Sequence, residues 1–245
     1  MKGFLPLTAL AALLGPIAAL TAPAQEPPPS KLARQVVVFD SRGRESIEGG
    51  GFQLLRADLG REKLEVTSTR RLAKHGRPLI TPELLSDCDV FVTDQRDAYE
   101  PGERRALQEF VKQGGGLLVL YEAEPGLPLG FGTRALLAEL RITARPGETG
   151  LTDYVERTHP IMLDVKELED PDVGTDFFAA GATVLAEIRG RAVAVALELK
   201  QGRVVAADRS LFRDPAEGKD NIGLADNRRF ATDCVRWLAK QLERP

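Results

Sequence analysis

Buried β-strands alternate with helix signals along the first half of this chain, and this alternation constrains the fold more than any other feature. Gln35–Asp40 reads QVVVFD, Asp89–Thr93 reads DVFVT and Leu117–Tyr121 reads LLVLY. Apolar runs without polar alternation are typical of strands buried on both faces of a parallel sheet. Because parallel strands need crossover connections, usually helical ones, the pattern predicts an α/β domain.

The connections carry the expected helix signals. Thr81 is an N-cap residue followed by Pro82 at the first helical position. The helix opened by Glu100 and Pro101 places three apolar side chains at i, i+3 and i+4 spacing, which gives one buried face. The remaining predictions for this half are a helix over Phe52–Leu59, a strand over Leu64–Ser68 and a helix end at Gly114–Gly115–Gly116.

The second half of the chain predicts an antiparallel extension of the sheet. Strand-like runs separated by tight turn residues, Arg189-Gly190 and Gln201-Gly202, are typical of hairpins. The predicted elements are a helix over Thr133–Leu140, strands over Ala182–Ile188, Ala192–Leu199 and Arg203–Ala207, and a closing helix over Asp226–Leu242.

The N-terminus predicts export. Lys2 precedes an apolar stretch from Phe4 to Leu20, and Ala22-Pro23-Ala24 offers the small residues that a signal peptidase reads, so cleavage is expected after Ala24. A membrane anchor is the competing interpretation, but prolines and a glycine interrupt the run, and it is short for a span of about 20 residues. We therefore expect a signal peptide over 1–24, a proline-rich linker over 25–33, a domain over 34–243, and a periplasmic or secreted protein without a stable membrane span.

Export would place the two cysteines, Cys88 and Cys234, in an oxidising compartment where disulfides can form. A disulfide between them is one possibility, and two buried free thiols are the alternative that we favour.

The net charge argues against binding to nucleic acid or to anionic lipid. The formal charge of −3 becomes −4 without Lys2, and a mildly acidic domain is unsuited to either ligand.

Two stretches of sequence resemble a known superfamily. They are Leu79–Leu120 and Gly202–Leu238, the latter containing GRVVAADRSLF and DNRRFATDCVRWL. Their order is similar to that in class I glutamine-amidotransferase-like domains of gliding-motility and ABC-transport auxiliary proteins, of an intraflagellar-transport subunit and of uncharacterised bacterial exported proteins, with trehalose-utilisation domains as more distant relatives. The resemblance implies a flavodoxin-like three-layer sandwich with a mainly parallel sheet and an antiparallel extension near the C-terminus.

Catalytic members of that superfamily carry a cysteine at a sharp turn between a strand and a helix, where backbone N–H groups and the helix dipole lower its pKa. Here the corresponding strand, Leu117–Leu120, is followed by Tyr121-Glu122-Ala123-Glu124. Cys88 precedes a strand and Cys234 lies within the last helix. The resemblance therefore implies the fold without the amidotransferase chemistry.

Acidic residues at strand ends are the candidate ligand-binding residues. Ligands of open parallel sheets collect at the carboxyl ends of the strands, and the residues at these ends are Asp40, Asp94, Glu122 and Asp208. Convergent carboxylates suit a hard cation, sugar hydroxyls or acid–base chemistry. The alternative is that each side chain caps the backbone that follows it.

The remaining polar motifs are weaker indications of a functional site. His159 is a further candidate at the border of the cleft, but His75 and His159 lack metal-ligand spacing, so no metal and no cofactor is expected. Gly49–Gly51 lacks the spacing of a phosphate-binding loop, and Ser210 lacks the surroundings of a nucleophile elbow.

These observations favour an exported, non-catalytic binding or scaffolding domain whose partner is a carbohydrate or another protein. One alternative is a hydrolase or sugar-modifying enzyme that uses the strand-end carboxylates. Another is an auxiliary subunit of a transport or motility assembly.

Overall fold

A computed structural model describes residues 35–42, 51–72, 79–94, 99–123, 133–171, 174–214 and 221–243, all within the compact unit Arg34–Pro245. The predicted signal peptide, its cleavage site at Ala24, the linker, Gly49, Gly50 and His75 lie outside the described residues. Within the described ranges, every helix is too short or too polar to span a bilayer.

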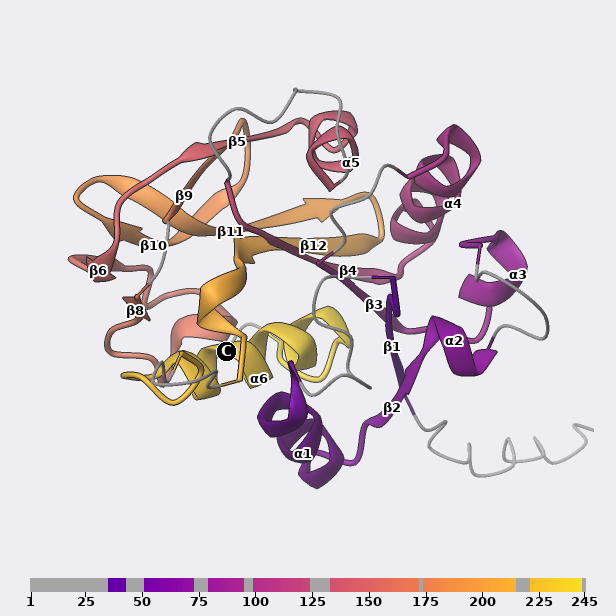
Figure 1. The fold of residues 1–245 in the computed structure, drawn as a ribbon, viewed down its shortest axis with the longest axis horizontal. Coiled ribbons are helices and arrows are strands. Elements are labelled where there is room, and N and C mark those ends of the chain that lie inside the picture. Colours follow the sequence, from indigo (N-terminus) through magenta and orange to yellow (C-terminus); the bar gives the residue numbers. More distant parts are fainter. Residues whose placement is uncertain are drawn as a thin grey trace, which may run out of the picture. The chain divides into compact units, whose positions relative to one another are not determined.

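An eight-stranded sheet forms the centre of the domain, in the order β2-β1-β3-β4-β12-β11-β10-β7 (Figure 1). The strands from β2 to β12 in this order are mutually parallel. The parallel strands are β1 (Val36–Phe39), β2 (Glu65–Ser68), β3 (Val90–Thr93), β4 (Gly116–Tyr121) and β12 (Gly202–Asp208). The α/β class with a mainly parallel sheet, predicted from the buried runs, is confirmed.

The rest of the sheet is antiparallel, as predicted. Strand β11 (Arg191–Leu199) pairs with β12 and with β10 (Thr183–Ile188), and the short β7 (Tyr154–Val155) pairs with β10. Arg189 and Gly190 connect β10 to β11 with φ of 51° and 70°. Two successive positive φ values are typical of the hairpin turn whose twist matches its strands.

Helices cover both faces of the sheet and complete a three-layer sandwich (Figure 1). One apolar core joins the sheet to α1 and α6, and the other joins it to α3, α4 and α5. The helices are α1 (Gln53–Arg61), α2 (Thr69–Leu72), α3 (Pro82–Leu85), α4 (Pro101–Lys112), α5 (Thr133–Glu139) and α6 (Asn227–Leu238), with 3₁₀ turns η1 (Pro160–Met162) and η2 (Arg209–Leu211).

Local signals set most helix boundaries. The Thr81 side chain accepts a hydrogen bond from the Leu84 N–H, and α4 begins with a capping box between Glu100 and Glu103. The last helix is shorter than predicted. It ends at Leu238 because Lys240 takes a φ of 59°, in the left-handed region that terminates helices.

Two small ribbons were not predicted. Strand β5 (Ile142–Pro146) pairs with β9 (Thr175–Ala179), and β6 (Gly150–Leu151) pairs with β8 (Glu169–Asp170). The strands of the second ribbon have two residues each, too few to show an alternation of polar and apolar side chains. Both ribbons depend on partners distant in sequence, and β8 brings Asp170 close to the end of β12.

Candidate functional site

The strand-end acidic residues share one edge of the sheet. Strands β1, β3, β4 and β12 are parallel neighbours in that order, so Asp40, Asp94, Glu122 and Asp208 follow one another along their carboxyl ends. Three of these residues are deeply buried: Asp40 is 3% exposed, Asp94 6% and Asp208 0%. The sequence placed these side chains at the correct edge, and the fold then buries the three aspartates.

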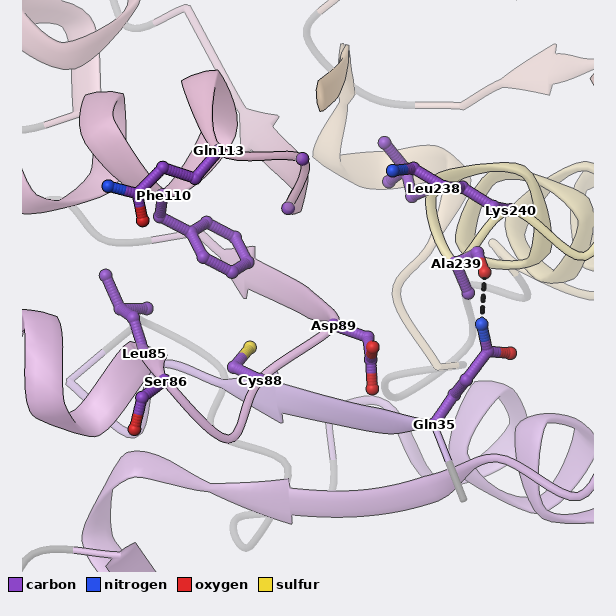
Figure 2. A pocket seen from close by; sticks show the side chains of 12 residues that line it. Gln35, Leu85, Ser86, Cys88, Asp89, Phe110, Gln113, Leu238, Ala239 and Lys240 are labelled. Atoms are coloured by element: carbon purple, nitrogen blue, oxygen red, sulfur yellow. Dashed lines mark hydrogen bonds between the residues drawn. The ribbon is translucent and has the colours of Figure 1, made fainter. Parts of the chain in front are cut away.

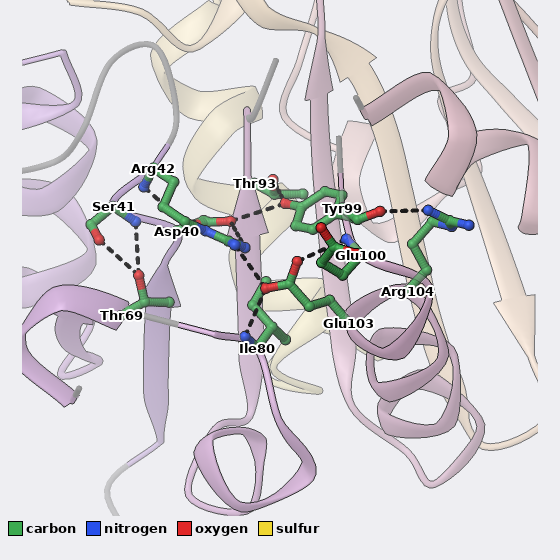
Figure 3. A network of polar contacts seen from close by, with 10 residues as sticks. All are labelled: Asp40, Ser41, Arg42, Thr69, Ile80, Thr93, Tyr99, Glu100, Glu103 and Arg104. Carbon is green, nitrogen blue, oxygen red and sulfur yellow. Dashed lines mark hydrogen bonds and ion pairs between the residues drawn. The ribbon is translucent and has the colours of Figure 1, made fainter. Parts of the chain in front are cut away.

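Asp40 belongs to a dense polar network at the ends of β1 and β3 (Figure 3). The guanidinium of Arg42 donates to both of its carboxylate oxygens, at 3.1 Å each, and the Arg42 backbone N–H donates to one of them at 3.0 Å. The Tyr99 hydroxyl donates to the other oxygen at 3.0 Å and also contacts Thr93 Oγ1. Asp40 therefore caps its own turn while holding two buried side chains.

Arg42 links this carboxylate to a second one. It donates to Glu103 at 2.7 Å and lies over the Tyr99 ring, 5.4 Å from its centroid. Burial alone would raise the pKa of Glu103, but the Ile80 and Glu100 N–H groups and the Arg42 guanidinium outweigh it and lower the pKa. Burial, together with the charge of Asp40, raises the pKa of Tyr99 well above its usual value. Sequence reasoning missed Arg42, Tyr99 and Glu103, because none of them directly ends a strand.

A second polar cluster lies at the end of β12. Ser210 donates its backbone N–H to Asp208 at 2.9 Å and its hydroxyl to Asp170 at 2.6 Å. Both carboxyl groups are fully buried. Burial and the charge of Asp170 raise the pKa of Asp208 well above its usual value. The Ser210 hydroxyl is thus a local hydrogen-bond donor that connects η2 to β8.

The tip of β4 is the position at which the resemblance noted in the sequence would place a catalytic cysteine. Tyr121, Glu122 and Ala123 occupy it. The Ala123 N–H donates to Thr175 Oγ1 at 3.1 Å, and the Thr175 hydroxyl donates back to the Tyr121 carbonyl at 3.3 Å. Glu122 pairs with Arg209, whose side chain is 3% exposed. Backbone and side-chain groups at this tip are therefore bound to other parts of the protein.

Both cysteines are buried free thiols. Cys88 belongs to the core beneath α3 and α4, and Cys234 to the core beneath α6, on the other face of the sheet. The disulfide that the sequence left open is wrong for this structure, because the sheet separates the two side chains. Burial raises the pKa of both thiols, well above the ordinary value in the case of Cys234.

His159 is not placed with the strand-end carboxylates. Its Nδ1 accepts from the Ile161 N–H at 3.3 Å, and its ring packs 4.9 Å from the ring of Trp237. It lines a 140 Å³ pocket with Thr183 and Glu198. Glu198 pairs in register with Arg203 at the start of β12, so His159 lies toward the amino edge of the parallel strands. The prediction that His159 borders a cleft at the carboxyl ends of the strands is therefore wrong.

The amino edge contains a larger pocket, of 340 Å³ (Figure 2). Residues directly before β1, β3 and β4 line it, together with the ends of α3, α4 and α6. Its lining consists of Gln35, Leu85, Ser86, Cys88, Asp89, Phe110, Gln113, Gly114, Gly115, Leu238, Ala239 and Lys240. The Gln35 side-chain amide bridges one wall by donating to the Ala239 carbonyl. Nothing in the sequence analysis singled out this edge.

Among the described residues of this α/β protein, Asp40 and Asp208 at the carboxyl edge are therefore buried and hydrogen-bonded within the protein. No family model matches the chain, and no curated protein matches it significantly. Among the described residues, no group of three or more His, Cys, Asp or Glu side chains is arranged to hold a metal ion.

Solved structures similar to this chain include ThuA-like proteins. A putative ThuA-like protein from Parabacteroides merdae matches with a TM-score of 0.59 and 11% identity over 85% of this chain and 91% of that one. The mmIFT52 N-terminal domain matches with a TM-score of 0.61 and 15% identity over 83% of this chain and 97% of that one. A cytoplasmic protein from Salmonella typhimurium matches with a TM-score of 0.58 and 17% identity over 86% of this chain and 100% of that one. At these identities the likeness establishes the fold alone.

Proposed function

We propose that this protein is an exported, non-catalytic binding or scaffolding domain of the amidotransferase-like branch of this fold. The observation that carries the proposal is the occupied tip of β4, where the Ala123 N–H is hydrogen-bonded to Thr175 and no cysteine or serine stands at positions 121–123. An acyl-transfer site needs an activated nucleophile beside free backbone donors. The chemistry of this tip supports binding or scaffolding.

The strand-end carboxylates give independent support. Asp40 accepts from the Arg42 backbone and Asp208 from the Ser210 backbone, which is the capping arrangement that favours scaffolding over a ligand cleft. Their burial keeps them from a substrate. The partner that we propose is another protein or a carbohydrate. An auxiliary subunit of an exported assembly is one form of such a scaffold.

The rival function is a hydrolase or sugar-modifying enzyme, and one observation favours it. Asp170 and Asp208 form a carboxyl pair in which the pKa of Asp208 is strongly raised by burial and by its neighbour, a feature of acid–base sites. Both side chains have 0% exposure, however. An enzyme using them would have to open this edge before substrate could reach either group.

The two functions are separated by binding and turnover measurements on the purified protein. We expect selective sugars or a defined protein partner to raise its melting temperature in a saturable manner, with no hydrolysis of chromogenic glycosides or of glutamine. Turnover that is abolished by Asp208→Asn but retained by the exposed control Asp87→Asn would overturn the proposal in favour of the enzyme.

Export is tested separately. Mass spectrometry of the protein recovered from a bacterial host should find a mature N-terminus at Gln25 in the periplasmic or secreted fraction. An intact N-terminus in the cytoplasmic fraction would contradict the predicted export. The binding proposal would then still be decided by the binding and turnover measurements.

A further inference from the structure

Two of three consecutive glycines, Gly114 and Gly115, line the 340 Å³ pocket at the amino edge. A Cβ on Gly115 would come within 2.3 Å of the Phe110 ring, and one on Gly116 within 2.7 Å of the Leu238 carbonyl oxygen. These glycines let Phe110 and the end of α6 lie directly against the backbone. The space left between the ends of α3, α4 and α6 forms the pocket (Figure 2).

The pocket has an apolar floor of a size that suits a small ligand. Leu85, Phe110 and Leu238 provide it, beside the buried Cys88. A volume of 340 Å³ lies at the lower end of the range of about 300–1,000 Å³ for small-molecule sites. The floor offers contacts to an aliphatic group of a few carbons.

The rim has two opposite charges on different walls. Asp89 belongs to the connection between α3 and β3, and its Oδ2 accepts from the Val36 N–H at 2.7 Å. Within the described residues, its Oδ1 has no hydrogen-bond partner, and it forms no ion pair with Lys240 across the pocket. Asp89 is exposed, so its carboxylate is available to a ligand.

Lys240 is positioned by the ends of two helices. Its left-handed φ of 59° turns the chain at the end of α6. Its ammonium nitrogen lies 3.3 Å from the place of a Cβ on Gly114, just past the C-terminus of α4. A cation is favourable there because the carbonyl end of a helix is partially negative. Lys240 is exposed and forms no ion pair within the described part of the chain.

We propose that this pocket binds a small zwitterion, a free α-amino acid with an aliphatic side chain. Its ammonium group contacts Asp89, its carboxylate contacts Lys240, and its side chain packs on Leu85 and Phe110. A simple amine would meet Lys240 with like charge, and a simple acid would meet Asp89 in the same way. One cation is too few for phosphate-rich ligands. The site is at the opposite edge from the strand-end carboxylates, so this proposal stands independently of the proposed function.

The test compares leucine with two molecules that each lack one of its charged groups, isopentylamine and 4-methylpentanoate. Thermal shift and calorimetry on the purified protein are expected to show saturable binding of leucine up to about 10 mM, and binding of either comparator at least about tenfold weaker. No saturable binding of leucine in that range overturns the proposal. So does equal binding of either comparator, because the second charge would then be irrelevant.

Variants tie the binding to the two residues. Asp89→Asn and Lys240→Gln should each weaken leucine binding by at least about tenfold, while Asp87→Asn and Lys200→Gln, at exposed positions outside the lining, leave it unchanged. All four positions are exposed, so the variants should fold. Leucine binding that survives in Asp89→Asn or Lys240→Gln would place the ligand elsewhere and refute the assignment.

Discussion

The two edges of the parallel sheet differ in how their polar groups are used. At the carboxyl edge, Arg42 and Tyr99 turn inward and saturate Asp40. At the amino edge, Asp89 and Lys240 face a pocket without pairing with each other. Open α/β sheets ordinarily bind ligands at the carboxyl edge. Here Asp40 and Asp208 at that edge are buried and bonded to the protein itself, while a pocket lies at the other edge.

The difference has a physical origin. A buried carboxylate is tolerated only when charge and hydrogen bonds compensate its desolvation, so the residues that end the buried strands require internal partners. At the amino edge, Asp89 and Lys240 are exposed and solvated, so no internal partner is required. An edge that is polar at buried strand ends is therefore not necessarily a ligand site.

Among the changes that test this difference between the two edges, removing Arg42 should lower the free energy of unfolding the most. Arg42→Met leaves Asp40 and Glu103 buried without their cation, and breaking such a pair costs about 3–5 kcal/mol. Urea unfolding of the variant measures this loss. Arg61→Ala is the control: Arg61 pairs with Asp58, but its side chain is 68% exposed, so little change is expected. Similar losses in both variants would mean that the Asp40 network is not a special source of stability.

Adding a methyl group near the amino edge should cause the next largest loss in the free energy of unfolding. A Cβ on Gly202 would lie 1.9 Å from the Val111 carbonyl oxygen, so Gly202→Ala should cost at least about 2 kcal/mol as backbone atoms are pushed apart. The control is Gly102→Ala in α4, where a Cβ meets nothing within 4 Å and a gain of about 0.5–1 kcal/mol is expected. Thermal or urea unfolding compares them. Equal effects would show that the packing between α4 and β12 is loose.

The buried acid pair should give the carboxyl edge a pH dependence. Because the folded-state pKa of Asp208 is raised above its unfolded value, the native protein loses stability as pH rises from about 4 through the folded-state pKa. Asp208→Asn should remove a slope of up to about 1.4 kcal/mol per pH unit in that window. Unfolding free energies of both proteins between pH 4 and 8 provide the measurement. A stability difference that does not vary with pH would contradict the pairing with Asp170.

The smallest effect concerns the two thiols. Both are buried with raised pKa values, so a colorimetric thiol reagent at pH 8 should react slowly with the folded protein and rapidly with both cysteines in urea. Cys88 lines the amino-edge pocket, so any native reaction should occur there first. Rapid modification of Cys234 in the folded state would show that the α6 face opens readily.

The sequence predicted the α/β class, the strand and helix order of the parallel half, and the three strands β10, β11 and β12, of which β12 proves to be parallel to β4. These elements carry strong local signals, such as the β-branched run of β1 or Thr81 before Pro82. It did not predict the ribbons β5–β9 and β6–β8. It also extended the last helix to Leu242, because the left-handed turn at Lys240 has no glycine to mark it.

For the candidate site, the sequence identified the strand-end residues Asp40, Asp94, Glu122 and Asp208 but not their environment. Arg42, Tyr99 and Asp170 are brought to them by loops and by the short β8. No spacing rule connects Asp170 with Ser210, forty positions apart. His159 was grouped with the wrong edge for the same reason, since its packing on Trp237 depends on α6.

By itself, the sequence determined which segments are buried strands, because apolar runs and caps act within a few residues, and it determined that the tip of β4 has no thiol. Only the tertiary structure decided that Asp40 and Asp208 are buried with internal partners and that the amino edge holds a pocket. Those outcomes depend on how loops and helix ends from distant parts of the chain meet, and desolvation acts on the assembled neighbourhood of a side chain, not on its position in the sequence.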